Sequence, residues 1–187
     1  RKESSAASDV YKRQGVWHGR EPIENFAKNV GRFIAEYGYQ SFPDYATLAN
    51  VIETADLNLA SEIMKNRQKS YIGNGIIEKN VLKYTYKEEN FEKWVALTQL
   101  VQAHAYGYAI RQHRIQTPHC MGTLFWQLND CWPGPSWSVL DYYGNEKTAY
   151  NEVKNYYKPI IASCEIVDNN LVACLLYTSD AADDSLR

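Results

Sequence analysis

The sequence predicts an α/β protein in which parallel strands alternate with helices, followed by an all-β piece. Two short apolar segments, 32–38 and 121–130, have the composition of buried strands, and a long amphipathic helix is expected over 88–115 between them. A hairpin pattern follows, in which 160–167 and 171–173 flank a turn. This order is typical of a parallel α/β barrel or a doubly wound sheet. Two strands cannot close a barrel, so most of such a barrel would be missing.

The first half of the chain alternates short helices with one strand. Pro22 stands where the first turn of a helix tolerates proline, and Gly31 is expected to end that helix. The segment 32–38 is apolar at its centre and ends at Gly38. Helices are predicted over 21–30, over 44–69 with a break near Asp56, over 76–84 and over 145–157.

The long helix shows the clearest periodicity, with one apolar face. At about 28 residues it would span roughly 42 Å, long enough to cover a barrel strand. His104 lies on the apolar face and is expected in the core, whereas His113 and His119 are expected to be solvated. Thr117-Pro118 should end the helix, and the glycine and prolines of 131–137 indicate a loop.

Composition excludes several classes of function. The net charge of −2 gives no basic surface of the nucleic-acid-binding type, and no apolar stretch reaches the roughly 20 residues that a membrane span needs. Cys120, Cys131 and Cys164 are too scattered for a disulfide framework or a metal site. The 13 % of aromatic residues suits a carbohydrate site, and it suits an ordinary core as well.

Both ends resemble a translated sequencing adaptor. The run SSAASDVYKRQ (4–14) resembles the adaptor on one strand, and CLLYTSDAAD (174–183) resembles it on the other. Codons that encode 179–183 also encode 5–8 when the complementary strand is read with a one-base shift. We therefore interpret 1–14 and 174–187 as adaptor-derived and not native, although a Ser/Ala/Asp-rich tail at each end is the alternative. The interpretation leaves 15–158 for the α/β part and 159–173 for the start of the all-β part.

The candidate site residues lie where the predicted strands end. Glu36 is a carboxylate at the end of a buried strand, the position at which barrel enzymes carry catalytic groups, although it could also cap a helix or pair with Arg32. Trp126, Asn129 and Asp130 end the second strand, with Trp132 and Trp137 in the loop that follows. Indole rings beside amide and carboxylate groups suit a sugar, and they equally suit packing between strand and loop.

Three motifs carry a resemblance to a known family. GVWHGREP, GRFIAEYGYQSFP and GTLFWQLNDCWPGPSWSVLDYYG together resemble the β-mannosidase branch of glycoside hydrolase family 2, in the family's order and spacing. The resemblance implies the C-terminal part of an incomplete TIM (β/α)8 barrel followed by the start of a β-sandwich domain. It implies Glu36 as the nucleophile and Trp126 as the floor of the sugar subsite, with Trp17 and His18 in a loop that lines the pocket.

The resemblance also implies a retaining exo-β-mannosidase that acts on β-mannoside oligosaccharides or glycans without a metal or cofactor. The family's acid/base glutamate follows an asparagine on an earlier strand, and no Asn-Glu pair precedes Glu36 here. A fragment that lacks half of the catalytic pair is expected to be inactive. A sibling β-galactosidase, β-glucuronidase or exo-β-glucosaminidase is the alternative within the family, and a non-catalytic carbohydrate-binding piece is the alternative outside it.

Overall fold

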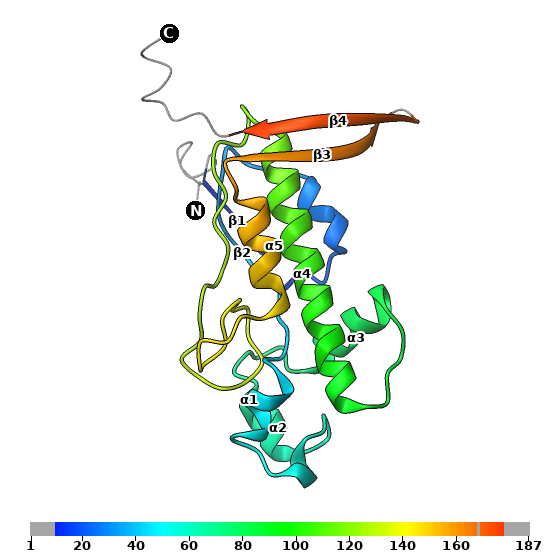
Figure 1. The fold of residues 1–187 in the computed structure, drawn as a ribbon, viewed down its shortest axis with the longest axis vertical. Helices are drawn as coiled ribbons and strands as arrows, with labels where there is room; N and C mark the ends of the chain where they lie inside the picture. Colours follow the sequence, from blue (N-terminus) through cyan, green and yellow to red (C-terminus); the bar gives the residue numbers. More distant parts are fainter. Residues whose placement is uncertain (1–9, 168, 178–187) are drawn as a thin grey trace, which may run out of the picture.

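The structure, a computed structural model, describes residues 10–167 and 169–177 of the chain. Within them, two separate pairs of strands accompany a set of helices (Figure 1). β1 (Val10–Arg13) pairs in parallel with β2 (Phe33–Tyr37), and β3 (Ile160–Val167) pairs antiparallel with β4 (Asn170–Tyr177). The predicted first strand and the predicted hairpin are therefore confirmed, and the described part of the chain is a mixed α/β piece.

The predicted helices are present, most of them shorter than expected. The long one is α4 (Phe91–Ile115), which runs along most of the molecule with α5 (Thr148–Tyr156) packed beside it (Figure 1). The others are the 3₁₀ helix η1 (Ile23–Ala27), α1 (Tyr45–Ala49), the 3₁₀ helix η2 (Thr54–Asp56), α2 (Glu62–Arg67) and α3 (Gly75–Tyr84). Asn90 begins α4 by accepting a hydrogen bond from the Lys93 N–H, which satisfies one of the free donors of the first turn.

The expected second strand, 121–130, is not a regular strand. It runs extended beside β2, and the Ile34 N–H donates to the Gly122 carbonyl at 2.9 Å while the Leu124 N–H donates to the Ile34 carbonyl at 2.8 Å. Only an isolated bridge between Ile34 and Thr123 results. Because the segment contacts β2 on one side and has no strand on its other side among the described residues, its side chains at Met121, Leu124 and Leu128 are exposed.

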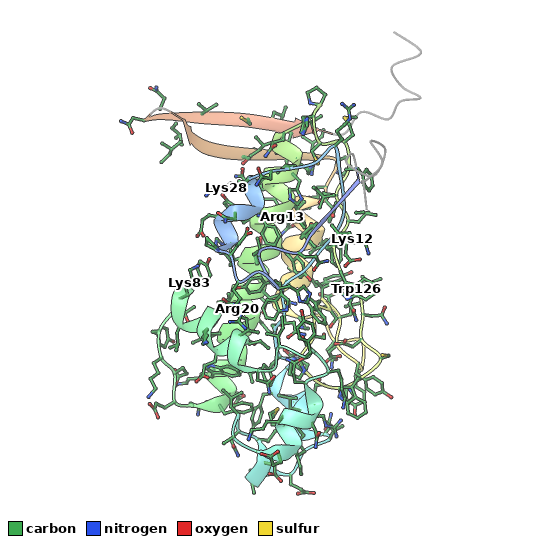
Figure 2. All side chains as sticks on the ribbon, turned by 180° about the vertical axis from the view of Figure 1, so that it is seen from behind. Lys12, Arg13, Arg20, Lys28, Lys83 and Trp126 are labelled. Carbon is green, nitrogen blue, oxygen red and sulfur yellow. The ribbon has the colours of Figure 1, made fainter. Side chains whose placement is uncertain are left out.

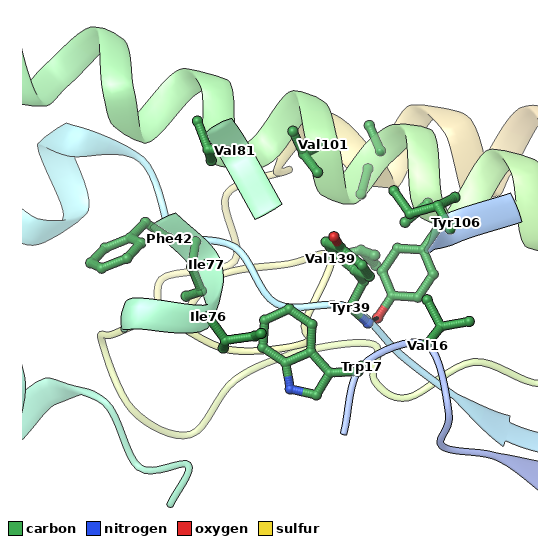
Figure 3. Packing of buried hydrophobic residues seen from close by; sticks show 14 of the residues in the cluster. Val16, Trp17, Tyr39, Phe42, Ile76, Ile77, Val81, Val101, Tyr106 and Val139 are labelled. Carbon is green, nitrogen blue, oxygen red and sulfur yellow. Dashed lines mark hydrogen bonds between the residues drawn. The ribbon is translucent and has the colours of Figure 1, made fainter. Parts of the chain in front are cut away.

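Part of the core lies where one face of α4 packs against the segments that carry Trp17, Tyr39 and Val139. Figure 3 shows Trp17, Tyr39 and Tyr106 packed together with Val139, and all four are buried. The rings of Trp17 and Tyr39 meet edge to face, with their centroids 5.0 Å apart. This packing places α4 directly behind the end of β2.

The histidines of α4 lie opposite to their predicted environments. His104 is exposed, between the rings of Tyr84 and Tyr108, whereas His113 is completely buried and hydrogen bonded through Nδ1 to the Thr123 hydroxyl at 2.7 Å. The buried face of α4 includes Thr98 and Gln102, which a purely apolar pattern assigns to solvent. The buried face therefore keeps most of the predicted apolar residues and extends to these polar ones, whereas Leu100 and His104 of the predicted face are exposed.

β1 lies inside 1–14, the N-terminal segment that we interpret as adaptor-derived, and β4 extends past residue 173 into the C-terminal one. Their pairing shows where these residues lie and does not test their origin. Residues 1–9 and 178–187 of the two segments lie outside the described residues. Among the helices of the described part, none is both long and apolar enough to span a membrane.

Candidate active site

A pocket of about 300 Å³ opens at the carboxyl end of β2. Four segments far apart in the sequence line it: Gln14 and His18, then Glu36, Tyr37 and Gly38, then Tyr71, and finally Trp126 and Trp137. Glu36 is the only carboxylate among these lining residues. Figure 2 shows Trp126 and Lys12, a partner of Glu36, on the same side of the molecule.

A second pocket of about 280 Å³ lies at the opposite end of β2, next to Phe33. Its lining is mostly apolar and, as far as the structure describes it, contains no carboxylate. Because parallel α/β folds place catalytic groups at the carboxyl ends of their strands, we take the pocket of Glu36 as the candidate active site.

Glu36 is held by two donors from the N-terminal segment. Lys12 Nζ lies 2.7 Å from Glu36 Oε2, and Gln14 Nε2 donates to Oε1 at 2.8 Å. The glutamate side chain is 25 % exposed, so the carboxylate remains open to the pocket. Both donors belong to 1–14, so on the adaptor interpretation these two contacts are particular to this chain and other groups would face Glu36 in a native protein.

The positions of the two pocket tryptophans depend on Gly38, two residues after Glu36. A Cβ on Gly38 would lie 2.6 Å from the Trp126 carbonyl oxygen and 2.7 Å from the Trp137 ring, closer than any side chain permits. The Trp126 N–H donates to the Tyr37 carbonyl at 2.7 Å. The glutamate-aromatic-glycine order therefore allows the Trp126 backbone and the Trp137 ring to approach the chain beside Glu36.

His18 and Tyr71 form the remaining aromatic part of the lining. Their rings are stacked, with centroids 5.9 Å apart and planes 11° apart, and His18 Nδ1 lies 3.2 Å from the Tyr71 hydroxyl. His18 also lies 6.1 Å from the Trp137 ring, so the three rings form one continuous row. No sequence motif indicated Tyr71, which lies in a loop and is 87 % exposed.

The other predicted site residues lie outside the pocket lining. Trp17 is buried against Tyr39, with its ring 6.4 Å from that of Trp137. Asn129 is exposed beyond the pocket, and its carbonyl accepts a hydrogen bond from Gln127 Nε2. Asp130 accepts from the hydroxyls of Ser136 and Ser138 at 2.5 and 2.6 Å, so it braces the loop that carries Trp137.

Charged groups are buried behind this loop. Burial raises the pKa of Asp130, although its two serine donors oppose the shift. Burial lowers the pKa of Lys147 to about 7, and its ammonium reaches the carbonyls of Ser41 and Ser136 at 3.4 and 3.5 Å. These groups lie behind the tryptophans rather than in the pocket, so their geometry suits support of the loop. Within the described residues, no group of His, Cys, Asp and Glu side chains could hold a metal ion.

Comparisons with known proteins place this geometry in a family, although no family model matches the sequence. The chain is 35 % identical over 150 residues to β-mannosidase B of Aspergillus flavus and 34 % identical over 164 residues to β-mannosidase B of Thermothelomyces thermophilus. Each match covers 78 % of this chain. The crystal structure of the β-D-mannosidase from Dictyoglomus thermophilum superposes with a TM-score of 0.83 at 30 % identity, over 88 % of the chain.

The chain belongs to the β-mannosidase branch of glycoside hydrolase family 2. It spans 18 % of the length of the fungal β-mannosidases and 20 % of the Dictyoglomus chain. The exo-chitosanase from Amycolatopsis orientalis shares the fold, with a TM-score of 0.67 at 17 % identity. The β-mannosidase family thus supplies the context in which the pocket of Glu36 is interpreted.

The buried His113 predicts a pH dependence of stability in the full-length β-mannosidase homologue that contains this segment. Burial lowers the pKa of His113 to about 4, whereas an unfolded histidine titrates near 6.5. Between these values the unfolded chain binds a proton that the folded chain does not, so stability falls as the pH falls from about 6.5 to about 4. The loss from this group should reach about 2 kcal/mol at pH 5.

Thermal unfolding of the wild type and of His113→Gln at pH 7.5 and pH 5 would measure this effect. The variant should lose less stability than the wild type on acidification. His104→Gln, at an exposed position of the same helix, is the matched control and should behave as the wild type does. Equal acid sensitivity of all three proteins would contradict the prediction.

Proposed function

We propose that this chain is the C-terminal part of the catalytic barrel of a retaining exo-β-mannosidase that removes terminal β-D-mannose residues. The observation that carries the proposal is the pocket in which Glu36 faces Trp126 and Trp137 at the end of a buried strand, in a chain of the β-mannosidase family. Residues 159–173 then begin the β-sandwich domain, and 1–14 and 174–187 are adaptor-derived.

The proposed mechanism follows from the chemistry of Glu36. Its ionised carboxylate attacks the anomeric carbon of the mannoside while the bond to the leaving oxygen breaks, and a glycosyl-enzyme ester forms. A second, protonated carboxyl gives its proton to the leaving oxygen, and then takes one from the water that hydrolyses the ester. Retaining enzymes hold the two carboxyls about 5–5.5 Å apart. Because the described lining offers only Glu36, the second carboxyl is expected from a part of the enzyme outside this chain.

The aromatic row suits the sugar. The apolar face of a pyranose can stack on an indole ring, and we assign this contact to the half-exposed Trp126. Trp137, His18 and Tyr71 continue the aromatic surface along the pocket. The buried Trp17 ring contacts the Trp137 ring and supports it from the core, and Asp130 holds the loop of Trp137 through the Ser136 hydroxyl.

The proposal is tested by a rate panel on the full-length enzyme with aryl β-mannoside, β-galactoside, β-glucoside, β-glucosaminide and β-glucuronide. We expect the mannoside to have the highest kcat/KM. Preference for another sugar would keep the retaining mechanism and assign the enzyme to a sibling specificity, an outcome that the fold shared with an exo-chitosanase makes worth testing. No turnover of any substrate would favour a non-catalytic carbohydrate-binding protein.

A further inference from the structure

Tyr106, on α4, forms hydrogen bonds with several of the segments that surround the pocket. Its side chain is completely buried, and its hydroxyl lies 2.6 Å from the Trp126 carbonyl oxygen and 2.7 Å from the Trp137 carbonyl oxygen. The same hydroxyl accepts a hydrogen bond from the Tyr39 N–H at 3.4 Å, three residues after Glu36. One oxygen atom therefore contacts the backbone of Tyr39, just after the strand that carries Glu36, and the backbone of both tryptophans.

Gln102 makes a parallel set of contacts one helical turn earlier. Its Nε2 donates to the carbonyls of Tyr39 at 2.7 Å and Ser138 at 3.2 Å, and its Oε1 accepts from the Ser41 hydroxyl at 2.7 Å. Residues four apart lie on the same face of a helix, so both side chains point from α4 toward the pocket backbone. Two polar residues in the middle of a core-facing helix are costly unless each is satisfied, and here both are bonded to the site segments.

We infer that Tyr106 is a positioning residue that, with Gln102, sets the placement of Trp126 and Trp137 relative to Glu36. A tyrosine has one hydroxyl proton, so the backbone carbonyls of Trp126 and Trp137 share one donor. The shared hydroxyl holds these two carbonyl oxygens close to each other. Without the oxygen, the two carbonyls lose this buried partner and the indole platforms can shift. The inference rests on the proposed function, because it assigns an effect on sugar binding to a residue that touches no sugar.

The test is a double-mutant cycle in the full-length enzyme, assayed with an aryl β-mannoside. Tyr106→Phe should lower kcat/KM about tenfold, mainly through a higher KM, and should leave the pH profile of kcat unchanged because no reacting group is altered. If Tyr106 acts through the tryptophan, the same change made in a Trp126→Ala background should lower kcat/KM less than threefold. Additive effects in this cycle would overturn the inference.

Thr98→Val is the matched control on the same helix. The Thr98 hydroxyl is buried, accepts from the Phe42 N–H at 3.0 Å and donates to the Val95 carbonyl, and it contacts none of the lining residues. Its loss should lower thermal stability comparably to Tyr106→Phe while kcat/KM stays within about twofold of the wild type. A tenfold fall in this variant would show that general destabilisation explains the effect, and would overturn the inference.

A second cycle keeps the inference falsifiable if Tyr106→Phe does not fold. Gln102→Met retains the side-chain length and removes the hydrogen bonds to Tyr39 and Ser138. Its effect on kcat/KM should be non-additive with Trp137→Ala, and additivity would overturn the inference. Because the wild type is assayed first, absence of turnover refutes the proposed function and this inference together, whereas additivity in an active enzyme refutes the positioning role alone.

Discussion

Replacing Glu36 with glutamine in the full-length enzyme should lower kcat on the aryl β-mannoside at least about a thousandfold. The amide is close to the carboxylate in shape but is not a nucleophile, so no glycosyl-enzyme ester can form. A thousandfold loss corresponds to about 4 kcal/mol of activation free energy, which is within the range expected for loss of a covalent step. Thermal stability should change little, because the Glu36 side chain is partly exposed at the pocket and glutamine keeps its size.

Steady-state kinetics and thermal unfolding of the same preparations measure both expectations. Glu21→Gln is the matched control, since Glu21 accepts a hydrogen bond from Asn25 Nδ2 and does not line the pocket. It should keep nearly the full rate. A Glu36→Gln enzyme that retained more than a few per cent of the wild-type rate would contradict the assignment of the nucleophile.

The sequence predicted the elements that depend on the residues of a single segment. The apolar run 32–38 became β2, the periodic stretch near 88–115 became α4, and the turn after residue 167 became a hairpin. In each case the pattern reports a property of the segment itself, such as an apolar centre, a helical face or a turn. The break in the helical region near Asp56 was predicted for the same reason, and 3₁₀ helix η2 lies there.

Elements that depend on distant partners could not be predicted in this way. The segment 121–130 has the composition of a buried strand, but a strand needs a neighbour on each side to be buried, and the described chain supplies one. The predicted face of α4 was too narrow because Gln102 and Thr98 are polar yet buried, each held by a hydrogen bond to a segment more than 50 residues away. His113 is buried for the same reason, against Phe26 and Tyr37.

The candidate site also contains some residues that the sequence predicted and some that it did not. Glu36, Trp126 and His18 were predicted from motifs, and the structure brings them into one pocket. Tyr71 joins them from a loop that carries no pattern. The Tyr106 hydroxyl forms its hydrogen bonds with backbone atoms of the site segments, which no side-chain motif reveals. Trp17 belongs to one of the motifs yet packs in the core. A motif does not distinguish a residue that touches the ligand from one that supports it.

The 187-residue chain expressed alone should show no mannosidase activity and no single cooperative unfolding transition. Its pocket offers one carboxylate among the described lining residues, whereas a retaining mechanism needs two about 5–5.5 Å apart. Each of its described sheets has only two strands, an arrangement that is marginal in water. The exposed Met121, Leu124 and Leu128 belong to the segment beside β2 that has no strand on its other side among the described residues, where neighbouring strands would cover it in a complete barrel.

Differential scanning calorimetry and a mannoside assay on the isolated chain, beside the full-length enzyme as a control, test this directly. A cooperative transition with measurable turnover would mean that the isolated chain supplies both carboxyls and a closed core, and would overturn the assignment as a barrel fragment. A cooperative transition without turnover would contradict only the folding half of the prediction. We expect neither a cooperative transition nor turnover if the pocket of Glu36 is one side of an active site that preceding strands complete.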